Sequence, residues 1–385
     1  MSENTFACLA GDGVGPELMA AATRALDRVA HLHSLDLADV HLPFAGEAMT
    51  RSGHPLPAET RTAYRDVDAI LVSSQHEPAF EGVKADLHLA WRIARVQLGE
   101  RADVVVIAPM GAWADAIAVE RAFACASTRR GRVAAVSTDD SWFGFVEREQ
   151  VRWPGMQAER IGLGEAVVRL KESPATMDVV VTESHLLDGL VDAASHFAGS
   201  KAYVAHGWMP DSGPGVFAPG ESEADDLGGF DAADPTGMLL TASLLLGEGL
   251  KRRSASRTLE RAVGTAVGRN GSAPRQTRSF TDAVIALMPE ARTDVEDFDE
   301  VWRGVACSAR TRSCGPWRPK ASTSASASRA VRSCPSTTRS RVGRPFATCS
   351  RATSREPGTW QRATREPRAR SASRSPPPGP ARRTS

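Results

Sequence analysis

Two kinds of segment alternate along the first three quarters of the chain. Short apolar runs predict buried strands at residues 5–10, 69–73, 103–107, 132–137 and 178–183. Between and after them, apolar positions with helical spacing predict helices at residues 15–30, 116–127, 163–171, 185–196, 236–250 and 255–268. Strands that alternate with such helices predict an α/β fold, with a largely parallel sheet flanked by helices on both faces.

One further stretch breaks this alternation. Residues 207–229 are rich in Gly, Pro and acidic side chains, which predicts a long loop. Loops of that length are usually functional.

Composition separates a folded body from a basic tail. The 385 residues carry a net charge of +1, but residues 306–385 hold 18 Lys or Arg against two acids. The same 80 residues contain no Leu or Ile, and a segment so poor in apolar side chains is expected to be disordered. The sequence therefore predicts a folded domain over residues 1–290, an acidic linker over 291–305 and a disordered Arg/Ser/Pro-rich tail over 306–385.

The tail has two interpretations. A basic arm binds nucleic acid by displacing counterions, whereas a GC-rich gene translated in the wrong frame gives the same Arg, Ser and Pro content. We favour the second interpretation, because no aromatic interleaving or nucleic-acid motif accompanies the charge.

Cysteine usage and the N-terminal residues bear on the compartment. The predicted body contains two cysteines, Cys8 and Cys125, which favours a reducing cytoplasm. Acidic residues near the N-terminus indicate that no signal peptide is present. The apolar run at residues 238–246 is too short to span a bilayer. We therefore expect a cytoplasmic protein without a membrane partner.

A glycine-rich turn follows the first predicted strand. Residues 11–17 read Gly-Asp-Gly-Val-Gly-Pro-Glu, and the alternate glycines allow a tight turn that exposes backbone at a helix N-terminus. This turn differs from the GxGxxG dinucleotide fingerprint and is weak evidence by itself.

An ordered series of short motifs accompanies the turn. They are Pro-Leu-Pro-Ala-Glu-Thr at 55–60, Asp-Ala-Ile-Leu at 68–71, Asp-Val-Val-Val-Thr at 178–182, Asp-Gly-Leu-Val-Asp at 188–192, Asp-Leu-Gly-Gly at 226–229 and Asp-Pro-Thr at 234–236. Over residues 5–290 this series resembles the isopropylmalate/isocitrate dehydrogenase family of β-decarboxylating dehydrogenases, and 3-isopropylmalate dehydrogenase most closely.

The resemblance implies a fold, a reaction and a substrate site. It implies the isopropylmalate dehydrogenase fold and NAD-dependent oxidation and decarboxylation of a small 2-hydroxy acid, with Mg or Mn as the metal. Asp188 and Asp192, four residues apart on a predicted helix, correspond to metal ligands of hard oxygen type. The alternative is a solvated acidic face. Arg92 corresponds to an arginine that binds a substrate carboxylate, the alternative being a surface arginine on an amphipathic helix.

The resemblance also implies cofactor-binding residues, namely Asp12, Gly13, Asp226 and Asp234. An acid at Asp226 would accept hydrogen bonds from the adenosine ribose and repel a 2′-phosphate, which favours NAD over NADP. The alternative for Asp226 is one more acid in an acidic loop.

Several family residues are replaced. The first substrate arginine corresponds to Gly82, with Lys84 close by, the catalytic lysine to Thr138, and the metal-binding aspartate supplied across the dimer to Gly164. The segment after Ile107 that would carry the catalytic tyrosine and the dimerisation arm is mostly missing, which predicts a reduced second subdomain.

Whether the chain is an active enzyme is therefore left open, and no catalytic residue is assigned. Three hypotheses remain. The chain is a divergent dehydrogenase acting as a homodimer, or an impaired or regulatory subunit paired with a paralog. The least favoured is a nucleic-acid-binding protein that acts through its tail.

Overall fold

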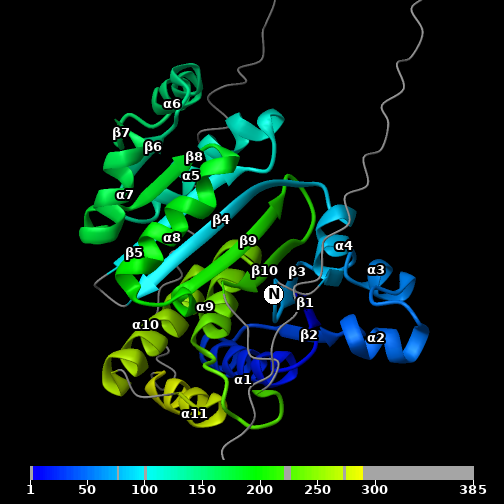
Figure 1. The fold of residues 1–385 in the computed structure, drawn as a ribbon. Helices are drawn as coiled ribbons and strands as arrows, with labels where there is room; N and C mark the ends of the chain where they lie inside the picture. Colours follow the sequence, from blue (N-terminus) through cyan, green and yellow to red (C-terminus); the bar gives the residue numbers. More distant parts are fainter. Residues whose placement is uncertain (1–2, 76–77, 99–101, 221–226, 272–274, 289–385) are drawn as a thin grey trace, which may run out of the picture. The chain divides into compact units, whose positions relative to one another are not determined.

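A mixed β-sheet forms the centre of the fold (Figure 1). The computed structural model describes residues 3–75, 78–98, 102–220, 227–271 and 275–288, so the predicted linker and tail lie outside the described residues. The sheet has the strand order β2-β1-β3-β10-β9-β4-β5-β8-β6-β7. Its strands are β1 (Asn4–Leu9), β2 (Leu37–His41), β3 (Ala69–Val72), β4 (Leu89–Leu98), β5 (Ala102–Pro109), β6 (Arg132–Val136), β7 (Gln157–Ile161), β8 (Val179–Thr182), β9 (Val204–Pro210) and β10 (Gly215–Pro219).

Helices connect and cover these strands. They are α1 (Gly15–His33), α2 (Ala45–Ser52), α3 (Ala58–Ala63), α4 (Pro78–Asp86), α5 (Asp115–Ser127), α6 (Phe143–Gln150), α7 (Leu163–Glu172), α8 (Leu187–Ala198), α9 (Thr236–Leu244), α10 (Arg253–Asn270) and α11 (Thr277–Leu287). A π-helical turn at Leu245–Gly249 continues α9. Among the described residues, no helix is long and apolar enough to cross a membrane.

The predicted α/β fold with a largely parallel sheet is confirmed. Three pairings in the middle of the sheet are nevertheless antiparallel, namely β9 with β10, β4 with β9 and β4 with β5. The strands predicted as apolar runs match β1, β3, β5, β6 and β8 within two residues. Each of these five strands has a parallel neighbour and is buried over most of its length, and strands buried on both faces are continuously apolar.

The prediction of a long loop over residues 207–229 is wrong for its first half. Residues 204–219 form the hairpin of β9 and β10, whose turn contains Gly213 at φ +101°. Gly207 lies inside β9, where a Cβ atom would come within 2.9 Å of Ile93 Cγ2 and 3.0 Å of Phe217. The glycine therefore marks close packing inside a strand, which composition alone does not distinguish from a loop.

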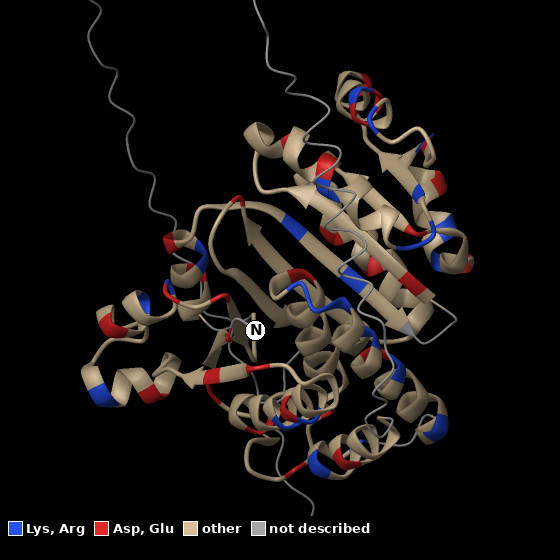
Figure 2. Ribbon diagram, turned by 180° about the vertical axis from the view of Figure 1, so that it is seen from behind, with Lys and Arg blue, Asp and Glu red and all other residues tan. Residues whose placement is uncertain are grey.

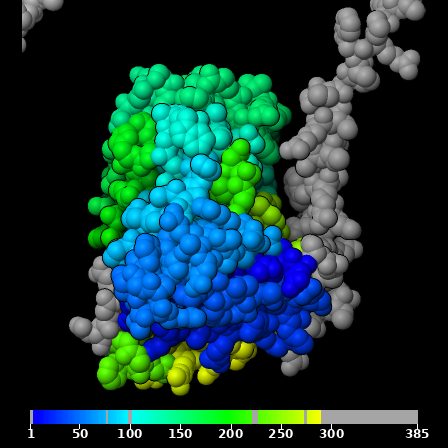
Figure 3. Space-filling model, turned by 90° about the vertical axis from the view of Figure 1, so that its right-hand side faces the viewer, coloured from blue at the N-terminus to red at the C-terminus, as the bar shows by residue number. Residues whose placement is uncertain are grey.

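Helices cover both faces of the sheet. One face packs against α1, α5, α9, α10 and α11 in the largest apolar core. On the other face, α7 and α8 cover the half of the sheet that contains β5, β6 and β8. Helices α3 and α4 and the start of α2 cover the half that contains β1, β3 and β10. In Figure 3 the segment that includes α2, α3 and α4 forms much of the surface turned toward the viewer, in the lighter blues.

Strand β4 lies where the two halves of that second face meet. Its side chains alternate, so that Ala94 and Val96 enter the core under α8 while Trp91 and Ile93 enter the core on the opposite face. Charged positions are sparse on the central strands and more frequent on the helices (Figure 2). The arginines of β4 are therefore exceptions that need partners.

Candidate functional site

Arg92 points from β4 toward the N-terminal part of α8. The alternative of a surface arginine on a helix is wrong, because Arg92 lies on a strand and its side chain is 19% exposed. Its Nη1 lies 2.8 Å from Asp188 Oδ1, and its Nη2 lies 3.3 Å from His206 Nδ1. Its Nε is buried and has no hydrogen-bond partner. The guanidinium is thus held on two sides, and its buried Nε–H has no acceptor in the protein.

Two side chains of strand β9, His206 and Trp208, contact this guanidinium. The sheet register pairs Arg92 with Trp208 and Ala94 with His206, so that the two β9 side chains share one face with Arg92. The Arg92 guanidinium lies 5.1 Å from the Trp208 ring centroid. Burial and the Arg92 charge lower the pKa of His206 well below its ordinary value, so the imidazole is neutral and Nδ1 accepts the hydrogen bond from Arg92.

A second cation approaches the same tryptophan. Lys84 Nζ lies 5.6 Å from the Trp208 ring centroid and 4.9 Å from that of Phe80, and it pairs with Glu81 at 2.6 Å. Gly82, to which the resemblance assigns the first substrate arginine, lies two residues before Lys84 on α4. Lys84 therefore returns a positive charge to this side of the site.

Asp188 and Asp192 lie one turn apart on α8, which starts shortly after β8. Their side chains are 72% and 60% exposed, and Asp192 pairs with Lys201 at 3.3 Å. Among the described residues, this pair belongs to no group of three acid, His or Cys ligand atoms within 4.8 Å of one another. Two hard oxygen ligands still fit Mg or Mn, because such ions are held by one or two carboxylates together with substrate oxygens and water.

Acid–base side chains are absent from the two replaced cross-dimer positions. Thr138 follows β6, and its backbone nitrogen donates to Glu183 Oε1 at 3.0 Å. Gly164 lies in the first turn of α7, where a Cβ atom would meet nothing within 4 Å. The two tyrosines serve elsewhere, since Tyr64 donates to Asp86 at 2.6 Å and Tyr203 accepts from Arg275 at 3.0 Å.

The predicted cofactor residues come from two segments that meet. Gly13 lies in the glycine turn with φ +58°, and a Cβ atom at Gly228 would come within 2.8 Å of its carbonyl oxygen. This contact brings the turn against the segment that follows Asp226, although Asp226 itself lies outside the described residues. The glycine turn and the residues just after Asp226 therefore lie side by side, and the cofactor role of Gly13 and Asp226 stays a prediction.

The other two predicted cofactor carboxylates have structural partners. Both Asp12 oxygens accept from the Gly46 backbone nitrogen at 3.0 Å, which places this carboxylate at the N-terminus of α2. Asp234 accepts from the Thr236 nitrogen at 2.9 Å before α9 and pairs with Arg275 at 2.7 Å. Both carboxylates accept hydrogen bonds from backbone N–H groups in the first turn of a helix, and their cofactor role stays a prediction.

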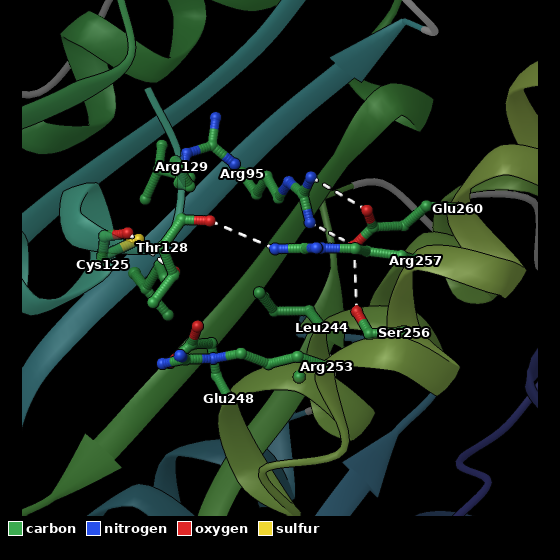
Figure 4. Close-up of a pocket in the computed structure, with 13 residues that line it drawn as sticks. Arg95, Cys125, Thr128, Arg129, Leu244, Glu248, Arg253, Ser256, Arg257 and Glu260 are labelled. Carbon is green, nitrogen blue, oxygen red and sulfur yellow. Dashed lines mark hydrogen bonds and ion pairs between the residues drawn. The ribbon is translucent and has the colours of Figure 1, made fainter. Parts of the chain in front are cut away.

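A cavity of about 70 Å³ lies on the opposite face of the sheet (Figure 4). Arg95 enters it from β4, and Glu260, Ser256 and Arg257 enter from α10. Because Arg92 and Arg95 are three residues apart on one strand, their side chains leave the sheet on opposite faces. This cavity is therefore separate from the site of Arg92 and Asp188.

Sequence analysis missed three members of the site, His206, Trp208 and Lys201. A signal for the first two existed in their spacing of two residues, which places them on one face of a strand. The predicted loop concealed that signal. For Lys201 no signal was available, because its pairing with Asp192 depends on the position of the short 3-10 helix after α8.

Comparisons with known proteins agree on one family. The family model described as isocitrate/isopropylmalate dehydrogenase matches residues 5–90 and 107–280. Arg92 lies in the unmatched residues 91–106, so its site role depends on the contacts described above. The 3-isopropylmalate dehydrogenase of Synechococcus sp. strain CC9902 is 29% identical over 323 residues, covering 68% of this chain and 90% of the relative. That of Bacillus anthracis is 29% identical over 350 residues, covering 75% of this chain and 98% of the relative.

A solved structure supports the same fold. A β-decarboxylating dehydrogenase from Thermococcus kodakarensis matches with a TM-score of 0.64 and 20% sequence identity, covering 74% of this chain and 96% of that protein. At this identity the match establishes the fold only.

Proposed function

Because the chain belongs to the isocitrate/isopropylmalate dehydrogenase family, we propose that it is a 3-isopropylmalate dehydrogenase-like oxidoreductase. Its reaction is the oxidation and decarboxylation of a small 2-hydroxy acid with NAD and Mg or Mn. One observation carries this proposal. Arg92 and Asp188, assigned separately to the substrate carboxylate and to the metal, lie on distant segments of the chain and are in contact at 2.8 Å.

Arg92 recognises the carboxylate end of the substrate. The planar fork of its guanidinium matches two carboxylate oxygens, and its buried Nε has no acceptor within the protein. The neutral His206 and the Trp208 ring hold the plane of that fork, and burial strengthens each charge-assisted hydrogen bond. Lys84, on the same tryptophan, attracts the second carboxylate of a dicarboxylic acid.

Asp188 and Asp192 hold the metal beside the same arginine. When bound, Mg or Mn supplies a Lewis acid for the oxygen of the reacting carbon. Arg92 orients the Asp188 carboxylate until the substrate carboxylate competes for the guanidinium, and Lys201 orients Asp192 in the same way. The turn at Gly13 and the segment around Gly228 would hold NAD, which accepts the hydride.

The test is metal-dependent NADH formation over a panel of malate-type 2-hydroxy acids. We expect turnover that requires Mn, and a loss of at least about 100-fold in Asp188→Asn, the scale typical of removing one group that stabilises developing charge. Asp211→Asn, in the exposed turn between β9 and β10, is the matched control and should keep full activity. Absence of turnover across the panel, together with no Mn binding by the folded protein, would reject the proposal.

A second candidate is a half-site subunit paired with an intact paralog. It is favoured by Thr138 and Gly164, which replace the two residues that family members supply to a partner's site, while the chain's own pair, Asp188 and Asp192, is kept. Co-purification from the native cell should then recover the paralog, and mixing the two chains should restore turnover. A homodimer that is active without a paralog would eliminate this candidate.

A further inference from the structure

A second group of metal-ligating side chains lies at the edge of the sheet, on β1 and β2. The Cys8 sulfur, an Asp39 carboxylate oxygen and a His41 ring nitrogen all lie within 4.8 Å of one another. In the parallel register, Cys8 pairs directly with His41, and Phe6 with Asp39. Because paired residues and residues two apart share a face, all three side chains project from the same face of the two strands.

The backbone holds these three positions firmly. Cys8 is 1% exposed and belongs to the main core, so its sulfur has little freedom to move. Asp39 Oδ2 lies 2.9 Å from His41 Nε2, and both side chains are exposed at the sheet edge. The group therefore has a fixed buried ligand and two outer ligands that solvent and ions can reach.

The group offers a thiol, a carboxylate and an imidazole to one ion. His41 is already paired with Asp39, so both outer ligands point toward the same place at the sheet edge. Burial and, to a lesser extent, the charge of Asp39 raise the pKa of the Cys8 thiol, so an ion must displace the thiol proton as it binds.

We propose that Cys8, Asp39 and His41 form a zinc-binding site. One sulfur, one nitrogen and one oxygen ligand suit the borderline-soft Zn²⁺ ion, with water in the fourth tetrahedral position. The hard carboxylates Asp188 and Asp192 instead select Mg or Mn. The chain therefore has two sites of different metal preference, and the zinc site does not depend on the proposed dehydrogenase activity.

Cobalt replaces zinc as the spectroscopic probe. The experiment uses the full chain with its four tail cysteines, Cys307, Cys314, Cys334 and Cys349, changed to serine, so that Cys8 and Cys125 are its thiols. Titration with Co²⁺ under reducing, anaerobic conditions should give one sulfur-to-cobalt charge-transfer band and intense tetrahedral d–d bands. Zinc should displace the cobalt stoichiometrically.

Matched variants assign the ligands. Cys8→Ser should abolish the charge-transfer band, whereas Cys125→Ser, in the buried part of α5, should keep it. Asp39→Asn and His41→Ala, at exposed positions that tolerate change, should weaken cobalt binding by more than the roughly 10- to 100-fold typical of losing an outer-sphere partner. His88→Ala is the exposed histidine control and should bind as the parent does.

Two further results separate this site from the proposed active site. Asp188→Ala should leave the cobalt spectrum unchanged, and Cys8→Ser should leave Mn-dependent NADH formation unchanged. A parent chain without a charge-transfer band, or a band that survives Cys8→Ser, would overturn the proposal. Full binding by folded His41→Ala and Asp39→Asn would overturn it as well.

Discussion

Arg92 and Arg95 lie on the same strand, and the two faces of the sheet give them opposite surroundings. Arg95 makes paired hydrogen bonds to two carboxylates. Its Nε and Nη2 donate to Asp103 at 2.9 and 3.2 Å. Its Nη2 also donates to one Glu260 oxygen at 3.0 Å, and its Nη1 donates to the other. Arg92 has one ion pair, to a carboxylate that is 72% exposed, and a buried Nε without a partner. Every guanidinium nitrogen atom of Arg95 has an acceptor, whereas Nε of Arg92 has none.

The two arginines therefore differ in how completely the protein pairs them. A buried charge is tolerated when it is well paired, and Asp103 and Glu260 give every guanidinium nitrogen atom of Arg95 an acceptor. An incompletely paired buried guanidinium is unfavourable in the free protein, and a carboxylate ligand removes that cost. The arginine-lined cavity of Figure 4 is therefore part of the scaffold, while Arg92 belongs to the proposed substrate site.

Removal of Arg95 should have the largest effect. Arg95→Leu leaves Glu260, 7% exposed, without its cationic partner. Breaking a buried ion pair in this way typically costs about 3–5 kcal/mol, which urea unfolding would measure. Arg92→Leu is the matched variant on the same strand and should cost at most about 1 kcal/mol, because its partner Asp188 is solvated. Equal losses in the two variants would contradict the comparison.

Arg92 should matter more for ligand binding than for folding. Hydrogen bonds to charged groups contribute about 1.5–3 kcal/mol, so Arg92→Gln should weaken binding of a 2-hydroxy acid by roughly 10- to 150-fold. Arg92→Lys should restore little of this, because an ammonium lacks the planar fork. Calorimetric titration with the folded variants would measure both. Arg24→Gln, at an exposed position of α1, is the control, and unchanged affinity in Arg92→Gln would exclude it from the site.

Strands that consist of an uninterrupted apolar run could be predicted from the sequence. A strand whose apolar run is interrupted by charged residues could not. Strand β4 escaped detection because Arg92 and Arg95 break its apolar pattern, and the carboxylates that neutralise them come from α8, β5 and α10. The residue types of a strand do not reveal partners that the tertiary fold supplies.

The candidate site divides in the same way. Asp188 and Asp192 could be proposed as ligands because their spacing, directly after a strand, matches the family motif. His206 could not, because it takes part as a neutral buried imidazole, a state that depends on the core around β9 and on the Arg92 charge. The family motifs thus pointed to the two candidate ligands on α8, whereas the side chains that orient Arg92 required the sheet register.

The smallest effect we predict is a pH dependence that His206 gives to stability. Its pKa in the folded protein is lowered, first by burial and then by the charges of Arg92 and Lys201, so below the unfolded pKa of about 6.5 the unfolded chain binds the additional proton. Stability should therefore fall as the pH decreases below about 6.5, by up to about 1.4 kcal/mol per pH unit from this group. Urea unfolding of the parent and of His206→Gln, which keeps an acceptor for Arg92, would isolate this contribution as the difference between their slopes. Arg92→Leu should reduce the slope only in part, because burial is the larger cause, and identical slopes in the parent and His206→Gln would show that the imidazole is not held neutral by the site.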